Sequence, residues 1–170
     1  MLILECTKKL ADELKVSLQN IIPIGADALY SWHANLFTYN RKKCAIFMNN
    51  DTRFCFILYG LKKEHFKDFG RIVKEAVTEN FSAEGFEQDV IDKYIQVGGE
   101  ILYTKTSDRS TLGQMNDMVF MSTQVYLEDY LVEEKLNQIE VNKTLNRAPM
   151  VKWKYCRGFE GMNEELSKIK

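Results

Sequence analysis

A polar segment with one glycine spans residues 105–117, where a predicted strand runs directly into a predicted helix. The first N–H groups of a helix have no intrahelical partner and its dipole is positive at that end, so both favour an anion. Arg109, Gly113 and Asn116 follow the i, i+4, i+7 spacing of one helix face. The segment therefore predicts a pocket for a phosphate or a carboxylate, and its candidate ligand-binding side chains are Lys105, Arg109, Ser110 and Asn116.

A second explanation of this segment needs no ligand. Ser107 or Asp108 can cap the helix, because serine and aspartate side chains accept hydrogen bonds from the first backbone N–H groups. Gly113 costs about 1 kcal/mol relative to alanine inside a helix, so we expect another group to approach it closely. That group is either a ligand or the sheet, and the sequence leaves both explanations open.

His33 is one of two histidines and lies in a predicted strand over residues 29–39. Strand alternation places it on the same face as Ser31 and Asn35, so Asn35 can orient the imidazole or contact a ligand. An imidazole serves as a general acid or base near neutral pH. His33 is thus the candidate catalytic residue, and a hydrogen-bonded histidine at a helix–sheet junction is the structural alternative.

These residues define one functional hypothesis, an enzyme or sensor that acts on a phosphorylated small molecule or on RNA. In this hypothesis His33 transfers a proton and Arg109 holds a phosphate in a two-point contact. The other polar residues expected in the same cleft are Lys8, Lys9, Asn35, Lys105 and Ser110.

The leading hypothesis is instead a non-enzymatic binding or interaction protein. It follows from the lack of a nucleophile, a base and an oxyanion donor at a defined spacing. The sheet faces and an aromatic tail with Trp153, Tyr155 and Phe159 are the surfaces expected to meet a protein partner or a second copy of the chain.

Neither a cofactor nor a metal is expected from the sequence. It contains no glycine-rich phosphate-binding motif and no nucleophile-elbow motif. Its two histidines and four scattered cysteines form no zinc-binding pattern. Cys44 and Cys55 fall within apolar strand patterns and are expected in the core. Together with a start that lacks the basic segment of a signal peptide, these features predict a cytosolic protein.

The 170 residues, 45% of them hydrophobic, predict one globular domain over residues 1–170 with a peripheral tail at about 150–170. A net charge of −1 disfavours nucleic acid as a partner, and no apolar run is long enough for a membrane span. Nucleic-acid binding would need a local basic patch. The candidates are Arg41-Lys42-Lys43 and the group Lys152, Lys154 and Arg157, which also fit a solvated turn and a protected edge strand.

The expected fold class is α+β, with a mainly antiparallel sheet of about five strands packed against several helices. Hairpin-length connections at 40–42 and 49–52 join three strands. Two of these strands are apolar on both faces, which requires cover on both sides. The predicted strands are 1–6, 29–39, 43–49, 53–60, 100–105 and a late one at 151–155, and the predicted helices are 8–14, 63–81, 86–97, 109–136 and 138–146.

Four motifs carry a resemblance to a known family: Thr7-Lys8-Lys9-Leu10, Trp32-His33-Ala34-Asn35-Leu36, Leu58-Tyr59-Gly60-Leu61, and Lys105-Thr106…Arg109-Ser110…Leu112-Gly113…Met115-Asn116-Asp117. Over about residues 1–130 the chain resembles an uncharacterised bacterial and phage domain family of unknown function, which includes relatives of plasmid ORF-3-like proteins. The resemblance implies a cytosolic protein of a bacterium or a mobile element. It implies no activity, cofactor or catalytic residue.

Overall fold

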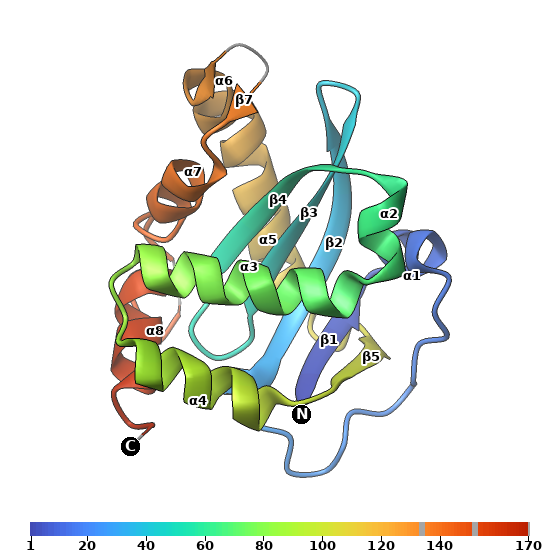
Figure 1. Cartoon of the computed structure of the whole chain (residues 1–170), viewed down its shortest axis with the longest axis vertical. Coiled ribbons are helices and arrows are strands. Elements are labelled where there is room, and N and C mark those ends of the chain that lie inside the picture. The colour runs from blue at the N-terminus through green and yellow to red at the C-terminus, as the bar shows by residue number, and fades with distance from the viewer. Residues whose placement is uncertain (133–134, 151–152, 170) are drawn as a thin grey trace.

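A five-stranded sheet forms the centre of the computed structural model, which describes residues 1–132, 135–150 and 153–169 (Figure 1). The spatial order of the strands is β4-β3-β2-β1-β5. Their bounds are β1 Leu2–Cys6, β2 Ser31–Tyr39, β3 Lys42–Asn49, β4 Cys55–Leu61 and β5 Ile101–Lys105.

The sheet is mixed, so the expectation of a mainly antiparallel sheet needs a correction. The hairpins β2–β3 and β3–β4 are antiparallel, as the short connections predicted. The central strand β1 pairs in parallel with both β2 and β5. Each of these parallel strands is reached through a long connection that contains helices, and such a connection is what a parallel pair requires. The α+β class and the five strands are confirmed.

One face of the sheet is covered by α1, α3, α4 and α8, and Figure 1 shows α3 and α4 crossing in front of it. Large side chains such as Trp32, Phe47 and Phe56 fill the space between the sheet and these helices. The bounds on this side are α1 Lys8–Leu14, α2 Lys63–Lys67, α3 Phe69–Ala83, α4 Gln88–Gly98 and α8 Gly158–Leu166, and a 3₁₀ turn at Ala28–Tyr30 precedes β2.

The opposite face packs against α5 (Arg109–Met121) and the elements that follow it, and α5 lies behind the sheet in Figure 1. Met115 and Met118 of α5 contact strand residues such as Ile46 and Ile57. Double cover of the strands that are apolar on both faces is therefore confirmed. The further elements are a π-helical turn at Ser122–Tyr126, α6 Leu127–Asp129, β6 Leu131–Val132, β7 Lys135–Leu136 and α7 Gln138–Leu145.

Three predicted elements differ from the structure. The helix expected at 63–81 is interrupted at Asp68, whose non-helical backbone separates α2 from α3. The helix expected at 109–136 is regular only to Met121, because the hydroxyls of Ser122 and Thr123 bond back to the Val119 carbonyl and a π turn follows. The strand expected at 151–155 lies partly outside the described residues, and 153–155 are irregular.

Candidate functional site

Three buried polar side chains form a row across the parallel half of the sheet. Glu5 of β1 is the register partner of His33 in β2 and of Thr104 in β5. All three are fully buried. Paired residues of neighbouring strands project to the same face, so the row lies beneath the N-terminal end of α5.

The Glu5 carboxylate is the centre of a hydrogen-bonded cluster. Its Oε1 accepts from Asn50 Nδ2 at 2.6 Å, and its Oε2 accepts from the backbone N–H and the hydroxyl of Ser107 at 2.8 and 2.6 Å. His33 Nε2 lies 3.4 Å from the same Oε2 atom. A buried charge is tolerated only when such donors satisfy it, and here the donors come from segments far apart in the sequence.

The hydrogen bonds around His33 show that its Nδ1 atom carries a hydrogen. Asn50 donates through Nδ2 to Glu5, so its Oδ1, 2.7 Å from His33 Nδ1, must accept a hydrogen bond from the imidazole Nδ1–H. The backbone N–H of Asp108 and the Oε2 atom of Glu5 both lie 3.4 Å from Nε2. His33 thus is a hydrogen-bonded histidine at a helix–sheet junction, the structural alternative that the sequence left open.

Asp108 caps α5, as the sequence predicted for Ser107 or Asp108. Its carboxylate accepts hydrogen bonds from the N–H groups of Ser110 and Thr111 and from the Thr111 hydroxyl. Burial alone raises the pKa of Asp108, but these hydrogen bonds and the charge of Arg53 outweigh it and lower the pKa below its usual value. The end of α5 that favours an anion is therefore already occupied by a carboxylate of the chain itself.

Arg53 is a buried cation that the sequence reasoning missed. Its Nε donates to Gln114 Oε1 at 2.6 Å, and its Nη2 lies 3.5 Å from Asp108 Oδ2. The guanidinium stacks on Trp153 at 3.5 Å from the ring centre, and its exposed fraction is 2%. Burial lowers the pKa of Arg53, and the charges of Asp108 and Asp51 oppose that shift. Nothing in the sequence distinguishes Arg53 from the polar residues of the turn that precedes it, so its burial could not be predicted.

The predicted face of α5 points to solvent. Arg109, Gly113 and Asn116 are all exposed, and α5 packs instead through Thr111, Met115 and Met118, which share the same spacing. The sheet does not approach Gly113, because a methyl group there would meet no described atom within 4 Å, and the close approach of a ligand stays a prediction. Arg109 forms no hydrogen bond or ion pair with any residue that the structure describes.

The remaining candidates are dispersed around the N-terminal part of the chain. Lys8 pairs with Asp12 at 2.6 Å, and Lys9, Lys105 and Ser110 are exposed. Asn35 accepts hydrogen bonds from the Thr7 hydroxyl and the Leu36 N–H. None of the seven candidates proposed beside His33 hydrogen-bonds to it within the described ranges. The shared cleft, and His33 as an acid or base in it, stay predictions.

The aromatic tail contacts the chain's own residues. Trp153 stacks on Arg53, Tyr155 donates to Glu165, and the Phe159 ring stacks on Phe86 with centres 5.8 Å apart. Both sheet faces are likewise covered by helices. The exposed recognition surface therefore has to be sought elsewhere on the molecule.

A groove of about 990 Å³ opens at the end of the sheet where the β2–β3 hairpin projects. Figure 1 shows α1 and α2 beside this hairpin, and β7 also contributes to the wall. Among the residues that the structure describes, eight of the lining residues are cationic and one is acidic. We call it the basic groove, and its charged lining residues are Glu13, Lys15, Arg41, Lys42, Lys43, Lys62, Lys63, Lys67 and Lys135.

Aromatic rings lie among these cations. The Lys42 ammonium sits 5.2 Å above the Tyr59 ring, and the Lys43 ammonium sits 5.8 Å above Phe66. Lys43 also pairs with Glu13 at 2.6 Å. Gly60 takes a φ of 73°, a backbone conformation that L side chains rarely adopt. A β-bulge in β4 lies beside it. A Cβ atom added to Gly60 would lie 3.7 Å from the stem of Lys42.

The sequence pointed to only one part of this groove. Arg41, Lys42 and Lys43 were recognised as a local basic patch in a hairpin connection. The lysines of α1, α2 and β7 are separated from that patch by tens of residues along the chain. Only the folding of the chain brings them together, because α1 and α2 pack against each other beside the hairpin.

Within the described residues no cluster of histidine, cysteine, aspartate and glutamate side chains has the composition of a metal site. A search of the same residues finds no helix with the length and apolarity of a membrane span.

A family model for a domain of unknown function, DUF6933, matches residues 3–158. The chain belongs to the DUF6933 family. The match confirms the expectation of an uncharacterised domain family, and it spans both the Glu5 cluster and the basic groove. Comparison with curated proteins and with solved structures gives no match. Function must therefore be argued from the geometry of this family member itself.

Proposed function

We propose that this protein is a binding protein whose basic groove takes an anionic polymer. The observation that carries the proposal is the charge of the groove, where the described lining residues include eight cationic side chains and one carboxylate. The whole chain has a net charge of −1, so the cations are concentrated in this region. A concave surface of one charge raises the local concentration of oppositely charged ligands and speeds their association.

The clustering of these cations has a cost that a ligand would relieve. Like charges held side by side repel one another and destabilise the folded chain. Of the groove cations, only Lys43 forms an ion pair with a residue in the described ranges. Arg41, Lys62 and Lys63 are exposed and contribute little to the apolar core. Recognition of an anion explains their placement better than packing does.

The test is titration of long-chain inorganic polyphosphate into the purified protein by calorimetry. Binding is expected to weaken steeply between about 50 and 200 mM salt, because each neutralised phosphate releases a counterion. Lys42→Glu and Lys63→Glu should each weaken binding about tenfold and should reduce the salt slope by about 1 or more.

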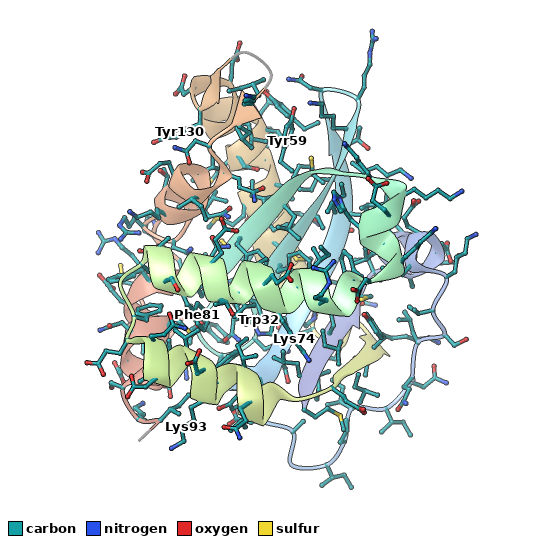
Figure 2. All side chains as sticks on the ribbon, viewed as in Figure 1. Trp32, Tyr59, Lys74, Phe81, Lys93 and Tyr130 are labelled. Atoms are coloured by element: carbon teal, nitrogen blue, oxygen red, sulfur yellow. The ribbon has the colours of Figure 1, made fainter. Side chains whose placement is uncertain are left out.

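The matched controls are Lys93→Glu and Lys74→Glu, which carry the same charge reversal outside the groove. Lys93 lies at the end of the molecule opposite Tyr59, which marks the groove (Figure 2). Both controls should bind polyphosphate much as the wild type does. Absence of binding, or equal losses in groove and control variants, would contradict the proposal.

We also propose a cytosolic location, in a bacterium or a mobile element as the family resemblance implies. All four cysteines are free thiols, and a reducing compartment maintains such thiols. Measuring the thiol content of the protein purified from its native host under alkylating conditions tests this, and a disulfide-linked form would contradict it.

A further inference from the structure

We infer that the polymer bound in the basic groove is single-stranded nucleic acid, with its phosphates on the groove lysines and a base stacked on Tyr59. The inference rests on the proposed function and deepens it, because it names the class of ligand. Cations that alternate with accessible aromatic rings are the combination that binds unpaired strands without reading their sequence. Four features of the groove support this ligand: its rings, its exposed Lys42, its rim and its size.

The aromatic part of the groove is a pair of tyrosines on β2 and β4, the two strands that flank β3. Tyr59 of β4 lines the groove and is half-buried. Tyr39 of β2 packs against it edge-on, with ring centres 6.3 Å apart and planes at 60°. This contact and the backbone bond from Tyr59 N–H to Gln138 hold the Tyr59 ring in place. A ring that is already ordered loses little conformational entropy when a base stacks on it.

Lys42 covers the Tyr59 ring and can exchange that contact for a phosphate. Its ammonium lies 5.2 Å above the ring centre, a cation–π contact worth about 0.5–1 kcal/mol at an exposed site. Lys42 is exposed on a flexible stem. When it moves to a neighbouring phosphate, it gains a stronger charge pair and opens the ring face to a base. The same residue therefore couples backbone binding to base stacking.

The rim of the groove is rigid where it carries Arg41. The two residues that join β2 to β3, Asn40 and Arg41, take φ values of 47° and 61°. Positive φ at both central positions is the tight hairpin turn that matches the twist of the strands. The turn therefore holds Arg41 at the hairpin tip, across from the lysines of α2.

The size and shape of the groove separate a single strand from the other anions. The groove volume of about 990 Å³ lies at the upper end of the range for small-molecule sites. Its cations come from four separate segments of the chain. A single mononucleotide would therefore leave most of these cations without a phosphate. A duplex keeps its bases stacked inside and offers Tyr59 nothing to stack on. An acidic peptide would satisfy the lysines but would gain less from the rings.

The experiment measures fluorescence anisotropy of labelled oligo-dT and oligo-U of about 20 nucleotides, longer than one fold's typical single-strand site. Competitors of matched charge are an abasic oligomer, a duplex, inorganic polyphosphate and polyglutamate. The single strands should bind at least fivefold more tightly than each competitor. Similar affinity for DNA and RNA strands is expected, because phosphate contacts and base stacking are common to both.

Variants separate the stacking contribution from the charge contribution. Tyr59→Leu should weaken oligo-dT binding to the level of the abasic oligomer and leave polyphosphate binding unchanged, while Tyr59→Phe should retain wild-type affinity. Lys42→Glu should weaken both ligands. Tyr39→Leu, which removes only the supporting ring, is the second variant if Tyr59→Leu does not fold.

The outcomes distinguish this inference from the proposed function. If the abasic oligomer, the duplex or polyglutamate binds as tightly as oligo-dT, the inference is overturned and polyanion binding stands. If Tyr59→Leu and Tyr39→Leu both fold and both retain wild-type affinity for oligo-dT, stacking on Tyr59 is excluded. The inference is then overturned, and polyanion binding stands. If neither polyphosphate nor oligo-dT binds, both the proposed function and this inference fail.

Discussion

Asn146, the C-cap residue of α7, bonds the backbone of Cys55 in β4 through both ends of its amide. Its Oδ1 accepts from the Cys55 N–H at 2.8 Å, and its Nδ2 donates to the Cys55 carbonyl at 2.8 Å. One turn earlier, Asn142 makes the same pair of bonds to Ile57 at 2.8 and 3.3 Å. The outer edge of β4 is thus satisfied by side-chain amides of a helix, which protects an edge strand from pairing with another chain.

Loss of these amides should destabilise the protein strongly. Asn142→Ala and Asn146→Ala each leave a buried backbone N–H and C=O of β4 unpaired, and each unsatisfied group costs about 1–3 kcal/mol. We expect each variant to lose about 2–4 kcal/mol of unfolding free energy in urea titrations. Lys143→Ala on the same helix is the control and should change it by less than about 0.5 kcal/mol. Equal effects of all three would show that the amide bonds to β4 contribute little.

The two arginines near the start of α5 should differ sharply when truncated. Arg53→Ala removes a buried cation from Gln114, Asp108 and Trp153, and we expect a loss of about 3 kcal/mol. Backbone strain at its φ of 63° is the same for alanine, so it does not enter the comparison. Arg109→Ala should stay within about 0.5 kcal/mol of wild type. Melting curves of both variants check this, and a larger loss in Arg109→Ala would contradict the assignment.

Acidification should reduce the contribution of Asp108 to stability. Its pKa is lower in the folded chain than its ordinary value of 3.8, so the ionised form stabilises the fold above that value. This contribution is lost as the pH falls through the folded-state pKa. Asp108→Asn retains a good helix cap but cannot ionise. The difference in unfolding free energy between wild type and Asp108→Asn should therefore shrink from about pH 6 to about pH 3. A constant difference would exclude the ionic contribution.

One cysteine should react in the folded protein. Cys156 is exposed, whereas Cys6, Cys44 and Cys55 are buried. Burial raises the pKa of both Cys6 and Cys55 to about 12, so neither holds much thiolate near neutral pH. A colorimetric thiol titration should give one fast equivalent in native buffer and four in denaturant. Cys156→Ser should abolish the fast phase, and a surviving fast phase would place a second thiol at the surface.

Removal of the acidic residue in the basic groove should strengthen binding of polyphosphate. Glu13 neutralises Lys43 at 2.6 Å, so Glu13→Gln frees that lysine for the ligand. An exposed ion pair is worth about 0.2–1 kcal/mol, which corresponds to a gain in affinity of up to about fivefold. Glu87→Gln at the N-cap of α4 removes the same charge outside the groove and should have no effect. Weaker binding by Glu13→Gln would show that Glu13 positions Lys43 for the ligand.

Local patterns in the sequence sufficed for most of the elements. Alternating apolar residues placed β3 and β4, and short polar connections predicted the antiparallel pairs β2–β3 and β3–β4. The cap of α5 at Asp108 and the core positions of Cys44 and Cys55 also follow from neighbouring residues alone. These features were predictable because the residues that determine them lie within one or two turns or strands of the chain.

The tertiary structure alone decided how these elements meet. The parallel pairing of β1 with β2 and β5 depends on long connections, whose path no local pattern encodes. Long-range contacts also place Glu5 beside His33 and Arg53 beneath Trp153. The residues of the second pair are a hundred positions apart in the sequence. The basic groove likewise exists only because helix packing gathers lysines from four segments. The sequence determined which side chains carry charge, and the long-range contacts of the core determined which of those charges share one surface.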